Sequence, residues 1–226
     1  PTSGQSSKLQ IKITGVRQHT IPASQNVSKF IDSMSVDNNG KRALFSARGE
    51  LFSVPKKNGV TRNLSRSPAS REISASWSPN GQYIAYLSDV SGEYEIYTKD
   101  RRQGNKVEQL TSDSSIWLFQ PVWSNDSKHL LYADKNHTLW LLNVENKKQT
   151  KIDTARYNES GLTEYLFSPN NQDIIYVKNN ENRYSSLWHY NVITNKSVRL
   201  TEEMTSERNP TVSPDGHYLY FSSQRD

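Results

Sequence analysis

The fold of this chain is decided by the stretch Trp77-Ser78-Pro79-Asn80-Gly81, because related stretches recur along the whole sequence. The other copies are Val36-Asp37-Asn38-Asn39-Gly40, Trp123-Ser124-Asn125-Asp126-Ser127, Phe167-Ser168-Pro169-Asn170-Asn171 and Val212-Ser213-Pro214-Asp215-Gly216. The first residues of successive copies stand 41, 46, 44 and 45 residues apart. A period of about 40–45 residues built from short strands is typical of β-propeller blades, whereas other repeats of this length are helical pairs.

The residues around each copy predict four strands per repeat. An apolar run follows each copy, at residues 43–45, 83–86, 130–132, 174–177 and 218–221. The Asn-Gly or Asp-Gly step before it supplies the turn that reverses the chain. Further strands are expected at 50–54, 95–97, 138–142 and 186–190, and then at 62–65, 108–111, 151–153 and 199–201. The predicted fold is therefore all-β, with blades that are four-stranded antiparallel sheets repeated about every 44 residues.

Large aromatic residues head most copies of the pattern. A four-stranded sheet cannot bury both of its faces alone, so a bulky residue at a repeated position fills the gap between neighbouring blades. We therefore expect Trp77, Trp123 and Phe167 to pack between blades. Stacking against a ligand is the alternative role.

The ends of the chain do not fit complete repeats. Residues 1–27 include an alternating run at 9–13 and are expected to be a linker or a strand from a preceding domain. Residues 28–226 are expected to form the propeller segment, with about four blades and the start of a fifth. The last copy stops soon after its first apolar run, which would expose a strand edge. These features predict an incomplete fragment of a larger propeller.

The charge pattern argues against a nucleic-acid partner. The formal net charge is +5, but Lys and Arg are scattered among Asp and Glu. The basic pairs at 56–57, 101–102 and 147–148 fall where exposed hairpin tips are expected. No apolar run is long enough for a membrane helix, so membrane insertion is not expected. The chain has no cysteine, which fits the cytoplasm and the periplasm equally and leaves the compartment open.

One part of the chain matches a known family more specifically than a general repeat does. The matching segments are residues 40–52, Thr61-Arg62-Asn63-Leu64-Ser65, residues 77–81, residues 84–89 and residues 92–97. They resemble the tricorn-type peptidase family, at the entry to its second propeller, whereas the shorter repeats are shared with TolB-like and WD-like propellers. The segment Ser124-Asn125-Asp126-Ser127 lacks the Pro and Gly of the pattern, so the later blades depart from it.

This resemblance implies a function. In that family two propellers precede a PDZ-like module and a serine-peptidase domain, and the propellers guide peptides toward an enclosed active site. The chain would then be a noncatalytic segment that gates or channels peptides, with the chemistry in a domain outside it. The implied partners are peptides or unfolded polypeptide and the other domains of the parent chain, with homo-oligomer formation left open. The alternatives are a TolB-like or WD-like scaffold for protein–protein interaction and the propeller of a prolyl-oligopeptidase-like hydrolase.

A search for reactive groups assigns no catalytic, cofactor-binding or metal-binding residue to this segment. No Gly-x-Ser-x-Gly nucleophile elbow is present, and the histidines lie in separate repeats. The Asp- and Asn-rich stretches 37–40 and 215–216 lack the spacing of a calcium loop and predict β-turns. Arg48 and Arg62 are candidates for binding peptide carboxylates, because guanidinium groups make bidentate contacts. The alternative is a structural hydrogen bond from each arginine to a neighbouring blade.

Overall fold

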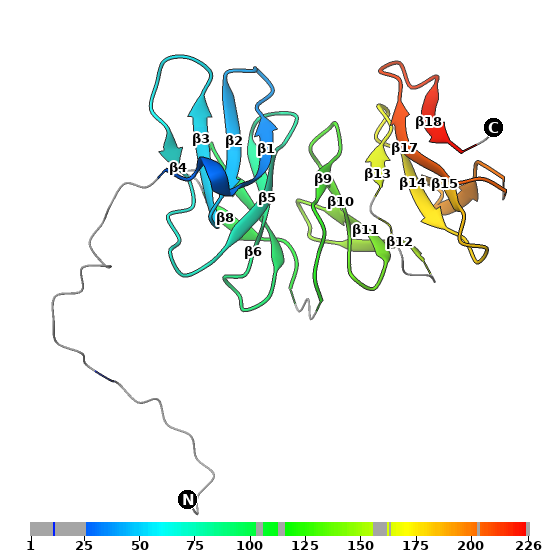
Figure 1. Cartoon of the computed structure of the whole chain (residues 1–226), viewed down its shortest axis with the longest axis horizontal. Helices are drawn as coiled ribbons and strands as arrows, with labels where there is room; N and C mark the ends of the chain where they lie inside the picture. The colour runs from blue at the N-terminus through cyan, green and yellow to red at the C-terminus, as the bar shows by residue number, and fades with distance from the viewer. Residues whose placement is uncertain are drawn as a thin grey trace, which may run out of the picture.

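A computed structural model shows β-sheets that follow one another in chain order across the molecule (Figure 1). It describes residues 11, 26–102, 106–112, 116–155, 162, 164–202 and 204–224. The expected strand at 9–13 and most of the expected linker at 1–27 lie outside the described residues. The division of the chain at residue 28 therefore stays a prediction.

Each sheet corresponds to one repeat of the sequence pattern, and we call the sheets blades 1 to 5. A short 3-10 helix, η2 (Ser28–Phe30), precedes blade 1. Blade 1 consists of β1 (Ile31–Val36), β2 (Arg42–Ala47), β3 (Glu50–Pro55) and β4 (Arg62–Asn63). Blade 2 consists of β5 (Glu72–Trp77), β6 (Tyr83–Ser88), β7 (Glu95–Asp100) and β8 (Val107–Gln109). Blade 3 consists of β9 (Val122–Trp123), β10 (His129–Ala133), β11 (Thr138–Asn143) and β12 (Gln149–Thr154).

The last two blades continue the same order. Blade 4 consists of β13 (Tyr165–Phe167), β14 (Asp173–Asn179), β15 (Ser185–Asn191) and β16 (Lys196–Arg199). Blade 5 contributes β17 (Glu207–Val212) and β18 (Leu219–Ser223). The strands predicted from the apolar runs are confirmed, and the four-stranded antiparallel sheets of blades 1 to 4 are those expected of propeller blades.

Strand order within the sheets puts the first strand of each blade at one edge. In blades 1 to 4 neighbours in the sequence are neighbours in the sheet, so the first and fourth strands are the edges. The first strands β1 and β5 lie next to each other, as do β13 and β17. The hydroxyl of Ser35 accepts a hydrogen bond from the backbone N–H of Trp77 at 3.1 Å, which ties two first strands together. The first strands thus form the inner side of the array.

The core lies between blades and not within a single sheet. Trp77 is 6% exposed and packs with Leu44 and Leu51 of blade 1. Trp123 packs with Leu87 and other blade 2 residues, and Phe167 packs with blade 3 residues such as Leu131 and Leu139. The prediction that these aromatic residues fill the gaps between blades is confirmed.

The repeated pattern forms a hydrogen-bonded turn between the first two strands. The hydroxyl of Ser78 accepts from the N–H of Tyr83 at 2.8 Å and donates to Asn80 Oδ1 at 2.8 Å. The hydroxyl of Ser124 makes the same two bonds, accepting from a backbone N–H at 2.9 Å and donating to a carboxylate at 2.6 Å. For Ser213 the two distances are 2.9 and 2.5 Å. The fifth residue of every copy has a positive φ, between 59° and 77°, in the chain order Gly40, Gly81, Ser127, Asn171 and Gly216. Glycine is therefore common there because it adopts this conformation without strain.

Candidate functional site

The inner side of the array carries a polar residue at the same place in every blade. The position lies three residues before the first residue of each repeated pattern, and we call its members the inner-edge polar set: Ser33, Ser74, Gln120, Glu164 and Asn209. All of them are half-buried or exposed. Gln120 and Asn209 are exposed, whereas the hydroxyl of Ser33 donates to Ser46 Oγ at 2.7 Å.

The backbone is irregular at these positions. The pairing register of the first strand shifts between Ile31 and Ser33 in blade 1 and between Ile73 and Ser76 in blade 2. In blade 5 it shifts across Asn209, and both Ser74 and Asn209 have positive φ values, 55° and 53°. Such bulges bend a strand, interrupt the hydrogen-bond ladder and redirect side chains. Side chains take over backbone donors that leave the ladder: the N–H of Ala75 lies 3.3 Å from the hydroxyls of Ser33 and Ser46.

A groove of about 520 Å³ between β13 and β17 contains two members of the inner-edge polar set. Its lining includes Glu164, Asn209, Phe167 and Pro210. A carboxylate oxygen of Glu164 accepts the N–H of Asn209 at 2.5 Å, and the other lies 3.5 Å from Arg208 Nη1. The groove thus offers apolar walls and a carboxylate already paired with a cation, which suits weak polar and apolar contacts.

At the other end of the array, the inner strand β1 carries an acidic group. Asp32 precedes Ser33 and is exposed. Partial desolvation raises the pKa of Asp32, and this effect outweighs the opposing influence of the Arg71 guanidinium and of hydrogen bonds from Ser33 and Ser46.

The two arginines predicted as candidate anchors lie in different places. Arg48 is exposed in the turn between β2 and β3, has φ 53°, and lies 6.0 Å from the centroid of the Phe30 ring. Arg62 is exposed at the start of β4 and lines a groove between blades 1 and 2. The structure does not bring the two together, and neither lies on a first strand. Their role as peptide anchors stays a prediction.

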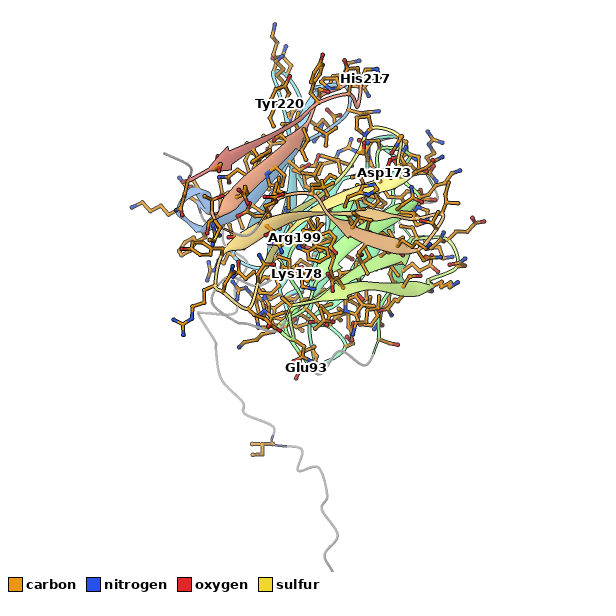
Figure 2. The ribbon with its side chains drawn as sticks, turned by 90° about the vertical axis from the view of Figure 1, so that its right-hand side faces the viewer. Glu93, Asp173, Lys178, Arg199, His217 and Tyr220 are labelled. Atoms are coloured by element: carbon orange, nitrogen blue, oxygen red, sulfur yellow. The ribbon has the colours of Figure 1, made fainter. Side chains whose placement is uncertain are left out.

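Two charged residues of β14 are held by polar partners. Figure 2 shows Asp173 and Lys178 near opposite ends of β14. Burial alone would raise the pKa of Asp173, but hydrogen bonds from Asn170, Asn191 and His189 together hold it below its usual range. Lys178 Nζ donates to both carboxylate oxygens of Asp153 at 2.8 Å. These contacts hold β14 in its own blade and tie it to β12 of blade 3.

No metal centre is formed by the described part of the chain, where no three His, Asp or Glu side chains gather closely enough to hold an ion. In the stretch 37–40, Asp37 Oδ1 accepts the N–H of Lys41 at 2.8 Å and that of Arg42 at 3.0 Å. The N–H of Gly40 donates to Asp37 O at 3.0 Å, so the predicted β-turn is confirmed. No described helix is long and apolar enough to cross a membrane.

Sequence reasoning missed the inner-edge polar set, although a signal was present. Its members occur at a constant offset from the repeated pattern, and each is polar while the neighbouring positions vary. Alternation on a strand could not reveal the position, because the bulges interrupt the alternation there.

Comparison with known proteins places this geometry in a family. The family described as "Tricorn protease second beta propeller domain" matches residues 31–226. A "Tricorn protease homolog" from Saccharolobus solfataricus is 25% identical over 225 residues, covering 100% of this chain and 20% of its own length. The chain thus spans about a fifth of that relative.

Solved structures show the same fold. The crystal structure of the tricorn protease aligns with a TM-score of 0.74 and 21% identity, over 87% of this chain and 19% of that one. A putative TolB from Agrobacterium tumefaciens aligns with a TM-score of 0.64 and 18% identity, over 85% of this chain and 69% of its own. The resemblance predicted from residues 40–97 is confirmed: the chain belongs to the family of second β-propeller domains of tricorn proteases.

Proposed function

We propose that this propeller segment guides peptides toward a catalytic domain outside the chain, and that the inner edges of its blades make the contacts. Membership of the tricorn second-propeller family supports a role within a larger peptidase. The carrying observation is the inner-edge polar set, which places one polar residue per blade on or beside the first strand, next to a register shift in blades 1, 2 and 5. Such edges can pair weakly with an extended backbone of any sequence, which suits passage better than tight binding.

The two end faces of the array, on blade 1 and blade 5, support assembly with further blades. Large apolar side chains are exposed on β1, at Ile31, Met34 and Val36, and near the chain end on Tyr220 and Phe221 of β18. At the junctions between blades 1 to 4 such faces are buried. We propose that neighbouring parts of a longer parent protein cover these faces.

A site-specific block tests the proposal for peptide passage. Gln120→Cys in the longer protein that carries this chain would receive a bulky maleimide adduct on the inner side. Lys57→Cys would place the same adduct on the exposed tip between β3 and β4. We expect the adduct at 120 to lower kcat/KM several-fold for long peptides and far less for very short fluorogenic ones. Equal effects from both positions, or no effect from the adduct at 120, would count against guidance along the inner edges.

A further inference from the structure

A second groove lies between blades 1 and 2, away from the first-strand edges and toward β4. Its volume is about 670 Å³. Apolar side chains form part of its lining, at Leu64, Trp77 and Ile84. We call it the basic groove, after the five cationic side chains that also line it: Arg42, Arg62, Arg66, Lys99 and Arg101.

No acidic side chain lines the basic groove. Three of its cations are held by neutral acceptors. Arg42 donates to the hydroxyl and carbonyl of Ser53 at 2.7 and 2.8 Å and to Val60 O at 3.1 Å. Arg101 donates to Gly81 O at 3.0 Å, and Lys99 Nζ donates to Leu64 O. These bonds fix the cations in place but leave their charges uncompensated.

The other two cations have no carboxylate partner either. Arg62 and Arg66 are exposed, and neither guanidinium forms an ion pair with a carboxylate in the described ranges. Burial, and then the nearby charge of Arg66, lower the pKa of Lys99 against the opposing effect of Glu72. The positive charges of the groove therefore repel one another, and an anion would relieve that repulsion.

An unpaired donor lies at the floor of the same groove. The Trp77 residue is only 6% exposed, and its Nε1–H has no acceptor among the described residues. The corresponding Trp123 Nε1–H does have one, Ser76 O at 3.4 Å. A buried donor without a partner costs free energy unless a ligand or water accepts its hydrogen bond. The indole nitrogen is itself buried from solvent, so Trp77 forms the floor of the groove without offering its N–H to an occupant.

We propose that the basic groove binds an acidic peptide segment through its side-chain carboxylates. The guanidinium groups of Arg62 and Arg66, which are both exposed, would bind the carboxylates. The apolar part of the lining and a volume far above that of one small anion favour a peptide over inorganic phosphate. Nucleic acid fits less well, because the Trp77 ring is buried and the Arg101 guanidinium lies 4.6 Å from its centroid, which leaves no open ring for a base.

This inference goes beyond the proposed guidance of peptides. The cations of the basic groove come from β2, β4 and β7 and the residues that follow β4 and β7, and its lining contains no member of the inner-edge polar set. Binding there stands whether or not peptides pass along the first strands. The two proposals can therefore fail separately.

Fluorescence anisotropy of a dye-labelled glutamate homopeptide tests the proposal. The test variant is Arg62→Gln with Arg66→Gln. The control variant is Lys106→Gln with Lys128→Gln, which removes the same charge from exposed residues in the groove between blades 2 and 3. We expect the test variant to weaken binding at least about tenfold, as loss of two charge-assisted contacts implies, and the control to change it little. If both variants weakened peptide binding equally, or neither did, the assignment of the binding site to the basic groove would be wrong.

Competitors distinguish the sources of the anion. A glutamine homopeptide of equal length should not bind. Displacement of the glutamate peptide by inorganic phosphate at similar concentration would show a small-anion site and overturn the peptide assignment. Tighter binding of a single-stranded oligonucleotide that depends on Arg62 and Arg66 would overturn it in favour of nucleic acid.

A resonance from the groove floor supplies a readout independent of the arginine variants. The indole ¹H–¹⁵N signal of Trp77, assigned with Trp77→Phe, should move when the glutamate peptide is added. The signal of Trp123 should stay in place. Movement of both signals alike, or of neither, would contradict binding at the basic groove.

Discussion

Blade 2 has a groove on each side, and the two grooves share their architecture but not their charge. The groove between blades 2 and 3, which we call the mixed groove, has a volume of about 510 Å³. Its charged lining residues are Asp100, Lys106, Glu108, Asp126, Lys128 and Glu145. The basic groove holds five cations and no acid.

The difference arises at equivalent strand positions. Arg42 begins β2 in the basic groove, and Tyr83 begins β6 in the mixed groove. One residue past the third strand, Arg101 is replaced in the next blade by Val144. Each groove also adjoins the buried tryptophan that heads a repeat. The repeat therefore fixes the buried tryptophan beneath each groove, while the charged residues around the groove can vary without loss of the fold.

The largest expected effect on stability comes from replacing the two tryptophans that lie beneath the grooves. Trp77→Ala should lower the free energy of unfolding by about 3–5 kcal/mol, because it removes a large buried side chain and leaves a cavity. Trp123→Ala should cost a similar amount, since Trp123 is 8% exposed and fills the same position. Urea unfolding of both variants measures this. A cost below about 1 kcal/mol for either one would contradict a shared structural role.

A smaller loss of stability is expected from replacing Arg42, at the rim of the basic groove. Arg42→Met removes three hydrogen bonds, to the hydroxyl and carbonyl of Ser53 and to Val60 O. We expect a loss of about 1–2 kcal/mol in unfolding free energy, because Ser53 is 3% exposed and keeps few other partners.

Tyr83→Phe is the matched change in the mixed groove. It removes one hydrogen bond, from Gln82 Nε2 at 2.9 Å, and should cost less than about 1 kcal/mol. The same denaturation series compares the two variants. Equal costs would mean that the arginine adds no more to stability than the tyrosine does.

In the mixed groove, charge is compensated by pairing. Lys147 Nζ lies 2.8 Å from Glu108 Oε1, and both side chains are 43% exposed. Glu108→Gln should therefore cost only about 0.2–1 kcal/mol at neutral pH.

The pH dependence of that cost has a defined sign. The hydrogen bond from Lys147 holds the pKa of Glu108 below its ordinary value, although partial burial opposes it. A carboxyl whose pKa is lower in the folded state stabilises the fold above its unfolded pKa and loses that contribution as the pH falls through the folded pKa. The stability difference between wild type and Glu108→Gln should therefore shrink at acid pH. Denaturation midpoints measured across this range check it, and a difference that grows on acidification would refute the pairing.

The sequence predicted the floors of the grooves but not their rims. Trp77 and Trp123 stand out because each heads a local turn pattern that can be read from consecutive residues. The basic groove combines Arg42 and Arg62 of one blade with Lys99 and Arg101 of the next, and only the packing of the two blades brings them together. Arg62 was identified from guanidinium chemistry alone, and Arg101 was expected only as an exposed turn residue. Scattered cations in the sequence concealed a cluster in space.

The smallest effect tests whether the cations of the basic groove interact. Burial lowers the pKa of Lys99, the charge of Arg66 lowers it further, and Glu72 opposes both. Arg66→Gln should therefore raise the pKa of Lys99, because it removes a repelling charge while leaving the burial unchanged. Lys106→Gln, in the mixed groove, should leave it unchanged. NMR titration of the Lys99 side chain measures both variants.

Binding of an acidic peptide should raise the same pKa, since a carboxylate favours protonated Lys99. A proton is then taken up on binding, and the affinity for the glutamate peptide should fall as the pH rises through the pKa of Lys99. If Arg66→Gln left this pKa unchanged, the cations would be too well screened to act together. The basic groove would then differ from the mixed groove in composition but not in electrostatic behaviour.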